Sequence, residues 1–190
     1  MAETTATEKL RVAVIMGGMS SEKEVSLESG RNIFSKMDRQ RFIPLAVFMD
    51  SQARLWEIPL KLLMRNSTRD IEEDLEGEAQ RLPYESLKEK TDVVCLGLHG
   101  KYGEDGCIQG LLELLGIPYT GSGVLASALG MDKYVCRRIF AMNGIDVPAT
   151  VPVSRRAWES AARAELLDRV TAEIGFPCIV KPTREGCSTA

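Results

Sequence analysis

Two acidic residues follow the first strong apolar run of the chain. Residues 11–16 (RVAVIM) form a short, β-branched run of the kind found in buried strands, and Gly17-Gly18 ends it. Glu22 and Glu24 then fall in the first turn of a predicted helix. One of these carboxylates could point across the strand ends and hold a substrate ammonium group. If this segment is considered by itself, a simpler explanation is that both carboxylates complement the helix dipole. A dinucleotide site is poorly supported, because G-x-G-x-x-G spacing is absent.

A second group of polar residues is concentrated in one glycine-rich turn. His99, the only histidine, opens the segment His99–Gly110, which has the sequence HGKYGEDGCIQG. Asp105 can cap the helix that follows, and His99 can be a satisfied histidine at the end of a strand. Neither role explains the density of glycines, which indicates that the backbone comes close to a ligand or to another loop.

Two lysines in the second half are candidates for binding phosphate. Lys181 follows the apolar run 178–180 and precedes Gly186-Cys187-Ser188-Thr189. A point charge, small residues and free backbone N–H groups together favour a phosphate cradle, although Walker A spacing is absent. Lys133 stands at the start of another predicted helix and, on its own, would be interpreted as a solvated surface group.

The elements that must position these residues alternate between strand and helix. A helix capped by Ser20 or Ser21 follows the first strand, and the acidic residues 70–80 form a solvated loop or a surface helix. We expect further strands over 42–48, 55–57, 92–98 and 178–181, and further helices over 107–115, 131–142 and 157–174. This alternation predicts an α/β fold with a parallel sheet, in which ligands bind where strands end and helices begin. Both glycine-rich turns lie at such positions.

Composition and charge narrow the class of protein. The 190 residues carry a formal net charge of −3, which argues against nucleic acid as a partner because phosphate backbones select a basic excess. No apolar run is long enough to span a bilayer, so we expect no membrane partner. Residues 1–10 lack the features of a signal peptide and are expected to be a disordered tail. Five cysteines without C-x-x-C spacing indicate a reduced, cytoplasmic protein, and a single histidine argues against zinc.

Four ordered motifs of the chain match a known family. Val14–Ser26 resembles the opening of the D-alanine–D-alanine ligases, and His99–Gly110 matches their signature H-G-x-x-G-E-D-G-x-x-Q-G at every position. The third motif has two neighbouring parts, Pro118–Gly123 and Ala126–Lys133. The fourth, Ile179–Gly186, is similar to the start of the family's central domain. The likeness extends from about residue 11 to about residue 188 and is weakest across residues 51–90.

The resemblance implies a fold and a reaction. An N-terminal substrate-binding α/β domain would span residues 11–121, and the beginning of an ATP-grasp central domain would span residues 122–190. In this family, ATP phosphorylates the carboxylate of one D-alanine, and the amine of a second attacks the acyl phosphate to give D-alanyl-D-alanine for peptidoglycan. ATP and Mg²⁺ are the implied cofactors. The magnesium ligands are expected beyond the end of this chain, so the chain alone is expected to be inactive. A homodimer formed through the N-terminal domain is also implied.

The resemblance also implies roles for individual residues. Glu22 would hold the ammonium group of the first D-alanine, with His99 beside the same subsite. The residues implied in binding ATP phosphates are Lys133, Lys181, Glu185, Gly186 and Ser188. Cys187 stands where the family usually carries a serine with a bridging role in catalysis, and a thiol is a weaker and longer hydrogen-bonding group.

Two alternatives remain open at this point. Another ATP-grasp ligase that joins a carboxylate to an amine would use the same phosphate chemistry, although the His99–Gly110 signature disfavours it. A non-catalytic remnant that binds a partner or a second copy of itself would explain a chain that ends in a loop. Reading the gene beyond the codon for Ala190 would separate the ligase from the remnant.

Overall fold

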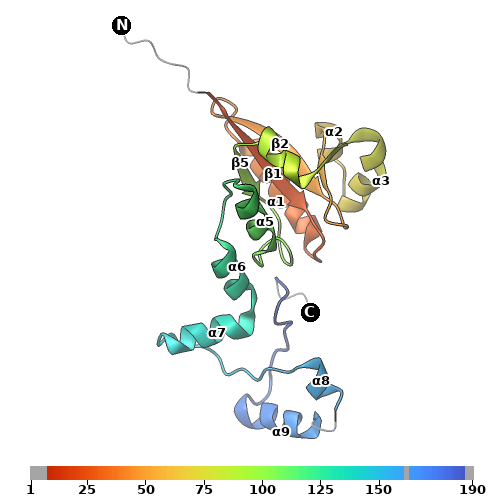
Figure 1. Cartoon of the computed structure of the whole chain (residues 1–190). Helices are drawn as coiled ribbons and strands as arrows, with labels where there is room; N and C mark the ends of the chain where they lie inside the picture. Colours follow the sequence, from red (N-terminus) through yellow and green to blue (C-terminus); the bar gives the residue numbers. More distant parts are fainter. Residues whose placement is uncertain (1–7, 161–162, 187–190) are drawn as a thin grey trace. The chain divides into compact units, whose positions relative to one another are not determined.

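The apolar run near the start of the chain forms β1 (Leu10–Gly17), an inner strand of a five-stranded sheet with the order β4-β3-β2-β1-β5 (Figure 1). β2 (Phe42–Met49) and β5 (Val93–Leu96) flank it, and both run parallel to it. β3 (Leu55–Glu57) and β4 (Gln80–Leu82) extend the sheet as antiparallel neighbours. The sheet is therefore mostly parallel, as the alternation of strands and helices predicts.

The computed structural model describes residues 8–160 and 163–186. Its contacts divide the chain into two units, residues 1–128 and 129–190, and each is described by itself. Within the described residues, no helix has the length and apolar composition that a membrane span requires.

Both faces of the sheet are buried. Val12, Val14 and Met16 of β1 pack on one face, while Ala13 and Ile15 pack on the other. The first face is covered by α1 (Lys23–Lys36), α2 (Leu60–Leu63) and α3 (Thr68–Glu78). The second face is covered by the 3₁₀ turn η1 (Tyr84–Ser86), α4 (Leu87–Lys90) and α5 (Cys107–Leu115). Successive side chains of a strand point to opposite faces of the sheet. A strand that is buried on both faces therefore needs the continuous apolar run seen in the sequence.

Helix α1 lies very close to the sheet at one point. A Cβ atom at Gly30 would stand 2.4 Å from the Cβ of Met16, so only glycine fits there. A Cβ at Gly97, just after β5, would stand 3.2 Å from the Cα of Gly30. Nearby, the buried hydroxyl of Ser26 donates a hydrogen bond of 2.9 Å to the carbonyl of Gly97. These contacts fix α1 against the ends of β1 and β5.

Residues 129–190 contain helices only, as far as the structure describes them. α6 (Val124–Met131) crosses the division between the two units and leads into α7 (Lys133–Met142). α8 (Arg155–Trp158) and α9 (Arg163–Glu173) follow. The single helix predicted over residues 157–174 is therefore wrong. The helix predicted from residue 131 begins at Lys133, because the side chain of Asp132 accepts hydrogen bonds from the N–H groups of Tyr134 and Val135.

The strand predicted over residues 178–181 does not form. Ile179 and Val180 are 80% and 84% exposed, and no described residue pairs with them in a ladder. A strand needs a hydrogen-bonded neighbour, so an apolar, β-branched run is not sufficient. Two smaller differences occur at element ends. β5 ends at Leu96, short of the expected 98, and the N-cap of α1 is Glu22 instead of Ser20 or Ser21.

Candidate functional site

The turn after β1 brings Glu22 to the edge of the sheet. Gly17 and Gly18 both adopt positive φ, and a Cβ at Gly17 would stand 2.6 Å from the carbonyl oxygen of Met49. The chain then reaches Ser20, whose Oγ donates to the carbonyl of His99 at 2.7 Å and accepts from the N–H of Glu22 at 3.1 Å. Ser20 therefore connects the turn after β1 to the turn after β5. Glu22 itself is only 5% exposed.

The turn after β5 is held by its own acidic residues. Glu104 accepts a hydrogen bond of 2.7 Å from the N–H of Gly100, which adopts a φ of +71°. Burial favours the neutral form of Asp105, but hydrogen bonds from the backbone of Tyr102 and from Cys107 outweigh burial and lower the pKa of Asp105. Asp105 is therefore a structural anion that accepts from the first N–H of α5, although the N-cap residue of this helix is Gly106 and not Asp105.

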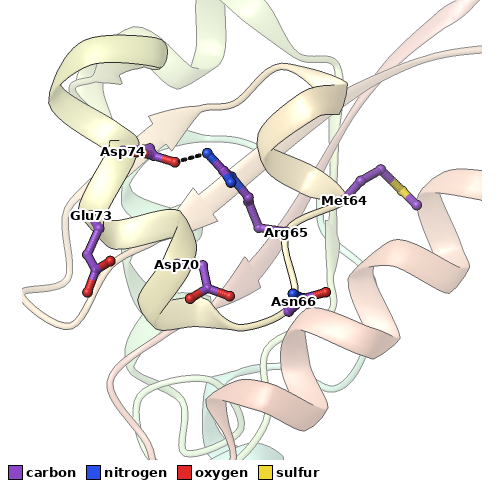
Figure 2. Close-up of a pocket in the computed structure, with 6 residues that line it drawn as sticks. All are labelled: Met64, Arg65, Asn66, Asp70, Glu73 and Asp74. Atoms are coloured by element: carbon purple, nitrogen blue, oxygen red, sulfur yellow. Dashed lines mark hydrogen bonds and ion pairs between the residues drawn. The ribbon is translucent and has the colours of Figure 1, made fainter.

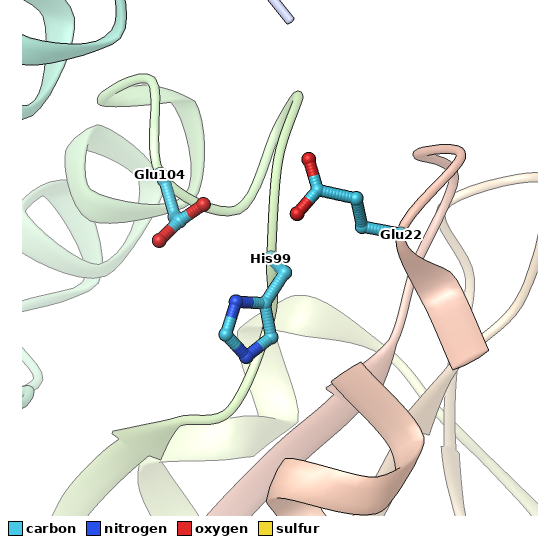
Figure 3. A group of neighbouring side chains, drawn as sticks. All are labelled: Glu22, His99 and Glu104. Atoms are coloured by element: carbon cyan, nitrogen blue, oxygen red, sulfur yellow. The ribbon is translucent and has the colours of Figure 1, made fainter. Parts of the chain in front are cut away.

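His99 is fixed by a contact from α1. Its Nε2 lies 2.8 Å from the hydroxyl oxygen of Ser29, which projects from the helix beside Ser26 and Gly30. Figure 3 shows that the other ring nitrogen, Nδ1, points toward the carboxylates of Glu22 and Glu104. One atom from each of these three side chains lies within 4.8 Å of the others. We call Glu22, His99 and Glu104 the acceptor cluster. The turns after β1 and β5, which the sequence identifies as ligand sites, meet here.

The spacing of the acceptor cluster suits an ammonium group. Three acceptors that each lie about 2.9 Å from a tetrahedral nitrogen stand about 4.7 Å from one another. A tetrahedral metal ion with ligands at about 2.1 Å would need them about 3.4 Å apart. Two carboxylates and an imidazole can also ligate a divalent metal, and both spacings fall within the 4.8 Å that bounds the separations in the cluster.

Sequence reasoning did not assign Glu104 and Ser29 to the site. From the sequence, Glu104 has no role beyond its place in the family signature, and the signal for Ser29 is the spacing S-x-x-S-G over residues 26–30. This spacing places two hydroxyls on one face of α1, where Ser26 binds Gly97 and Ser29 binds His99.

The lysines of the second half have different surroundings. Lys133, at the first turn of α7, donates through Nζ to the carbonyls of Glu185 and Gly186, the latter at 3.0 Å. Its N–H also donates to the carbonyl of Thr183 at 3.0 Å. Lys133 is therefore held against the predicted phosphate loop, whereas Lys181 is exposed. Cys187 and Ser188 lie outside the described residues.

Arg184 links the same loop to the start of α7. Its Nε donates to the carboxylate of Asp132 at 2.9 Å. The N–H of Val135, together with Arg184, lowers the pKa of Asp132 below its ordinary value. The first N–H groups of α7 are therefore bonded to Asp132 and to the carbonyl of Thr183, which leaves the charge of Lys133 as the feature of this turn that could attract a phosphate.

A separate hollow lies between α2 and α3 and shares no residue with the acceptor cluster (Figure 2). Its volume is about 510 Å³, and its lining is polar: Met64, Arg65, Asn66, Asp70, Glu73 and Asp74. Arg65 pairs with Asp74, and Asp70 completes a capping box with Ser67 at the start of α3. These charged groups are engaged in local structure, so we assign no ligand to the hollow.

Comparison with known proteins places the chain in a family. The family described as "D-ala D-ala ligase N-terminus" matches residues 11–122. A curated D-alanine–D-alanine ligase of Geobacillus thermodenitrificans is 38% identical over 95% of this chain and 52% of its own length. The chain therefore belongs to the D-alanine–D-alanine ligase family, which confirms the resemblance read from the four motifs. It spans about half the length of the curated relatives it matches.

Solved structures agree with this assignment. The VanG D-Ala:D-Ser ligase of Enterococcus faecalis is similar with a TM-score of 0.77 and 29% identity, over 95% of this chain and 54% of that one. A D-alanine–D-alanine ligase of Bacillus anthracis complexed with ATP gives a TM-score of 0.64 and 32% identity, over 94% of this chain and 49% of that one.

Proposed function

We propose that the chain supplies two parts of a D-alanine–D-alanine ligase: the site for the first D-alanine and part of the site for ATP. The observation that carries this proposal is the acceptor cluster, whose two carboxylates and imidazole gather acceptors for the N–H groups of an amino acid's ammonium group. D-Alanine is the substrate because it is common to the names of the curated and solved relatives.

In the proposed reaction, ATP transfers its terminal phosphoryl group to the carboxylate of the first D-alanine and leaves as ADP. The amine of a second D-alanine attacks the acyl phosphate, and phosphate leaves as the peptide bond forms. Glu22 and His99 would hold and orient the first D-alanine through its ammonium group, which leaves its carboxylate free to accept the phosphoryl group. The product would serve peptidoglycan synthesis.

The second unit would hold ATP phosphates. Lys133 is already placed beside Glu185 and Gly186, and its charge would offset that of a bound phosphate. Lys181 and Ser188 are proposed to act with it, and Cys187 is proposed to take the family's serine position. Bound Mg²⁺ would neutralise charge on the phosphates. We assign it no ligand among the described residues.

The proposals that concern the whole enzyme follow from the family. Because the curated relatives are about twice as long, we propose that residues 1–190 alone do not complete the ligation. A cytoplasmic homodimer formed through the first unit also remains a prediction.

Binding of D-alanine by Glu22→Gln tests the proposal. The substitution removes a charge-assisted hydrogen bond, so the Kd for D-alanine should rise by about 10-fold or more. Glu28→Gln is the matched control, since Glu28 lies on the same helix with a side chain 70% exposed. Isothermal titration with D-alanine, and with D-lactate as the analogue without an ammonium group, measures both. Equal affinity of the Glu22 variant and the parent would mean that Glu22 only complements the dipole of α1.

A further inference from the structure

Ser29 lies behind His99 and is not expected to contact the substrate. It belongs to the part of α1 that is held closely against the sheet, because Gly30 packs on Met16 and Ser26 is hydrogen-bonded to Gly97. Its hydroxyl oxygen is 2.8 Å from Nε2 of His99. A ring contacted on one edge by a fixed hydroxyl has a defined orientation, and here that orientation turns Nδ1 toward Glu22 and Glu104 (Figure 3).

The protonation of the ring decides what Nδ1 can do. A neutral imidazole carries its proton on one nitrogen and a lone pair on the other. A primary ammonium group has three N–H donors, and the two carboxylates supply acceptors for two of them. A third acceptor is available only if Nδ1 is unprotonated, which places the ring proton on Nε2. The hydroxyl of Ser29 can accept from that Nε2–H.

We propose that Ser29 is a positioning residue that holds His99 as the Nε2–H tautomer when substrate is bound, so that Nδ1 joins the carboxylates of Glu22 and Glu104 as the third acceptor of the substrate ammonium group. This inference rests on the proposed D-alanine site and adds Glu104 and Ser29 to it. Glu104 can serve while it accepts from Gly100, because a carboxylate has further lone pairs.

The groups that face the ring come from three places. Glu22 stands at the start of α1, Glu104 belongs to the turn after β5, and Ser29 projects from the second turn of α1. With the ring proton on Nε2, no N–H of the cluster is directed at the N–H groups of a bound ammonium group. A proton on Nδ1 would instead point at the ammonium group and remove its third partner.

Three acceptors would select between ligands by the number of N–H donors that each ligand offers. A primary ammonium group satisfies all three, whereas N-methyl-D-alanine offers only two N–H donors and D-lactate offers a single hydroxyl. The cluster should therefore discriminate against secondary amines, and this discrimination should weaken when Ser29 no longer fixes the ring.

His99 is the only histidine of the chain, so its ring nitrogens can be observed without assignment. Long-range ¹H–¹⁵N NMR spectra of the 190-residue chain, prepared with a tag free of histidine, report which nitrogen carries the proton. They would be recorded with and without saturating D-alanine. The variants are Ser29→Ala, Ser29→Thr, which keeps the hydroxyl, and Ser35→Ala. Ser35 is the matched control because it lies on α1 and its hydroxyl donates to the carbonyl of Asn32.

The expected result is an Nε2–H ring in the parent with D-alanine bound. Ser29→Ala should give a mixture of tautomers, raise the Kd for D-alanine by about 3- to 10-fold, and reduce the preference for D-alanine over N-methyl-D-alanine. Ser29→Thr and Ser35→Ala should behave as the parent does. An Nδ1–H ring or an imidazolium in the bound state overturns the inference, as does a Ser29→Ala variant with unchanged tautomer and preference. Absence of D-alanine binding by the parent would instead overturn the proposed function, and this inference with it.

Discussion

Replacing Gly30 by alanine would place a methyl group where the structure leaves no space for one. The new Cβ would stand 2.4 Å from the Cβ of Met16 and 2.8 Å from its sulfur, and Met16 is fully buried. Carbon atoms in contact lie about 3.5–4.0 Å apart, so α1 or β1 would have to move by about 1 Å. Overpacking of this kind costs about 1–3 kcal/mol, and the nearby Gly97 backbone favours the upper end.

The net effect includes the helix propensity of alanine. Alanine is better than glycine in a helix by about 1 kcal/mol, so Gly30→Ala should lower the free energy of unfolding of the first unit by about 2 kcal/mol. Gly77→Ala is the matched control. Gly77 lies inside α3, and a Cβ there would meet nothing within 4 Å, so this variant should gain about 0.5–1 kcal/mol.

Urea unfolding followed by tryptophan fluorescence measures both variants. Trp56 is 3% exposed and reports on the first unit, so Trp158 of α8 would be replaced by phenylalanine in every protein. The signal then follows one unit, as a two-state treatment requires. If Gly30→Ala were as stable as the parent, or gained stability as Gly77→Ala does, the close packing of α1 on β1 would be refuted.

Two further predictions concern a buried acid and the second unit. Burial favours neutral Asp50, but hydrogen bonds from the N–H of Arg54, from Trp56 Nε1 and from the Arg54 side chain outweigh burial and lower the pKa of Asp50. The stability that ionised Asp50 contributes is therefore complete above its unfolded-state pKa of about 3.9 and is lost as the pH falls through the lower folded value. Asp50→Asn should lower the free energy of unfolding of the first unit by about 1–3 kcal/mol at pH 7. Urea midpoints should show that the difference between variant and parent shrinks below about pH 3.9. A difference that stays constant with pH would contradict the stabilising role of ionised Asp50. Lys133→Ala should weaken ATP binding by about 10-fold or more in a titration with ATP alone, whereas Arg156→Ala on α8 should not. Equal losses in both variants would indicate a general charge effect.

The sequence predicts the strands that are buried on both faces. Residues 12–16 and 42–48 are apolar, and such runs form parallel strands when helices cover both sides. Residues 178–180 are also apolar, but no described residue pairs with them in a ladder. The composition of a segment shows that it could be buried and does not identify the strand that would pair with it. Of the ambiguous residues 70–80, residues 70–78 lie in α3, whose start carries the capping box of Ser67 and Asp70, and Gln80 begins β4.

The site could be predicted only in part, for a related reason. Glu22 and His99 follow strands that are adjacent and parallel, and the ends of such strands meet at one edge of the sheet. The contact of Ser29 with His99 depends on how closely α1 approaches the sheet, which is set by the packing of Gly30 on Met16. Local sequence patterns do not give that distance.

The pairing of β1 with β5 has a consequence for the time at which the site forms during folding. Arg11 and Asp92, which are bonded at the start of these strands, are 81 positions apart in the chain. Contacts between such distant residues form slowly, because a long loop must close, with a loss of chain entropy, before the contact can contribute any stability. Glu22 and His99 come together only after that closure. A newly made chain would therefore form α1 and the antiparallel pair of β2 and β3 before it could bind D-alanine at the acceptor cluster, and D-alanine binding would act late in folding.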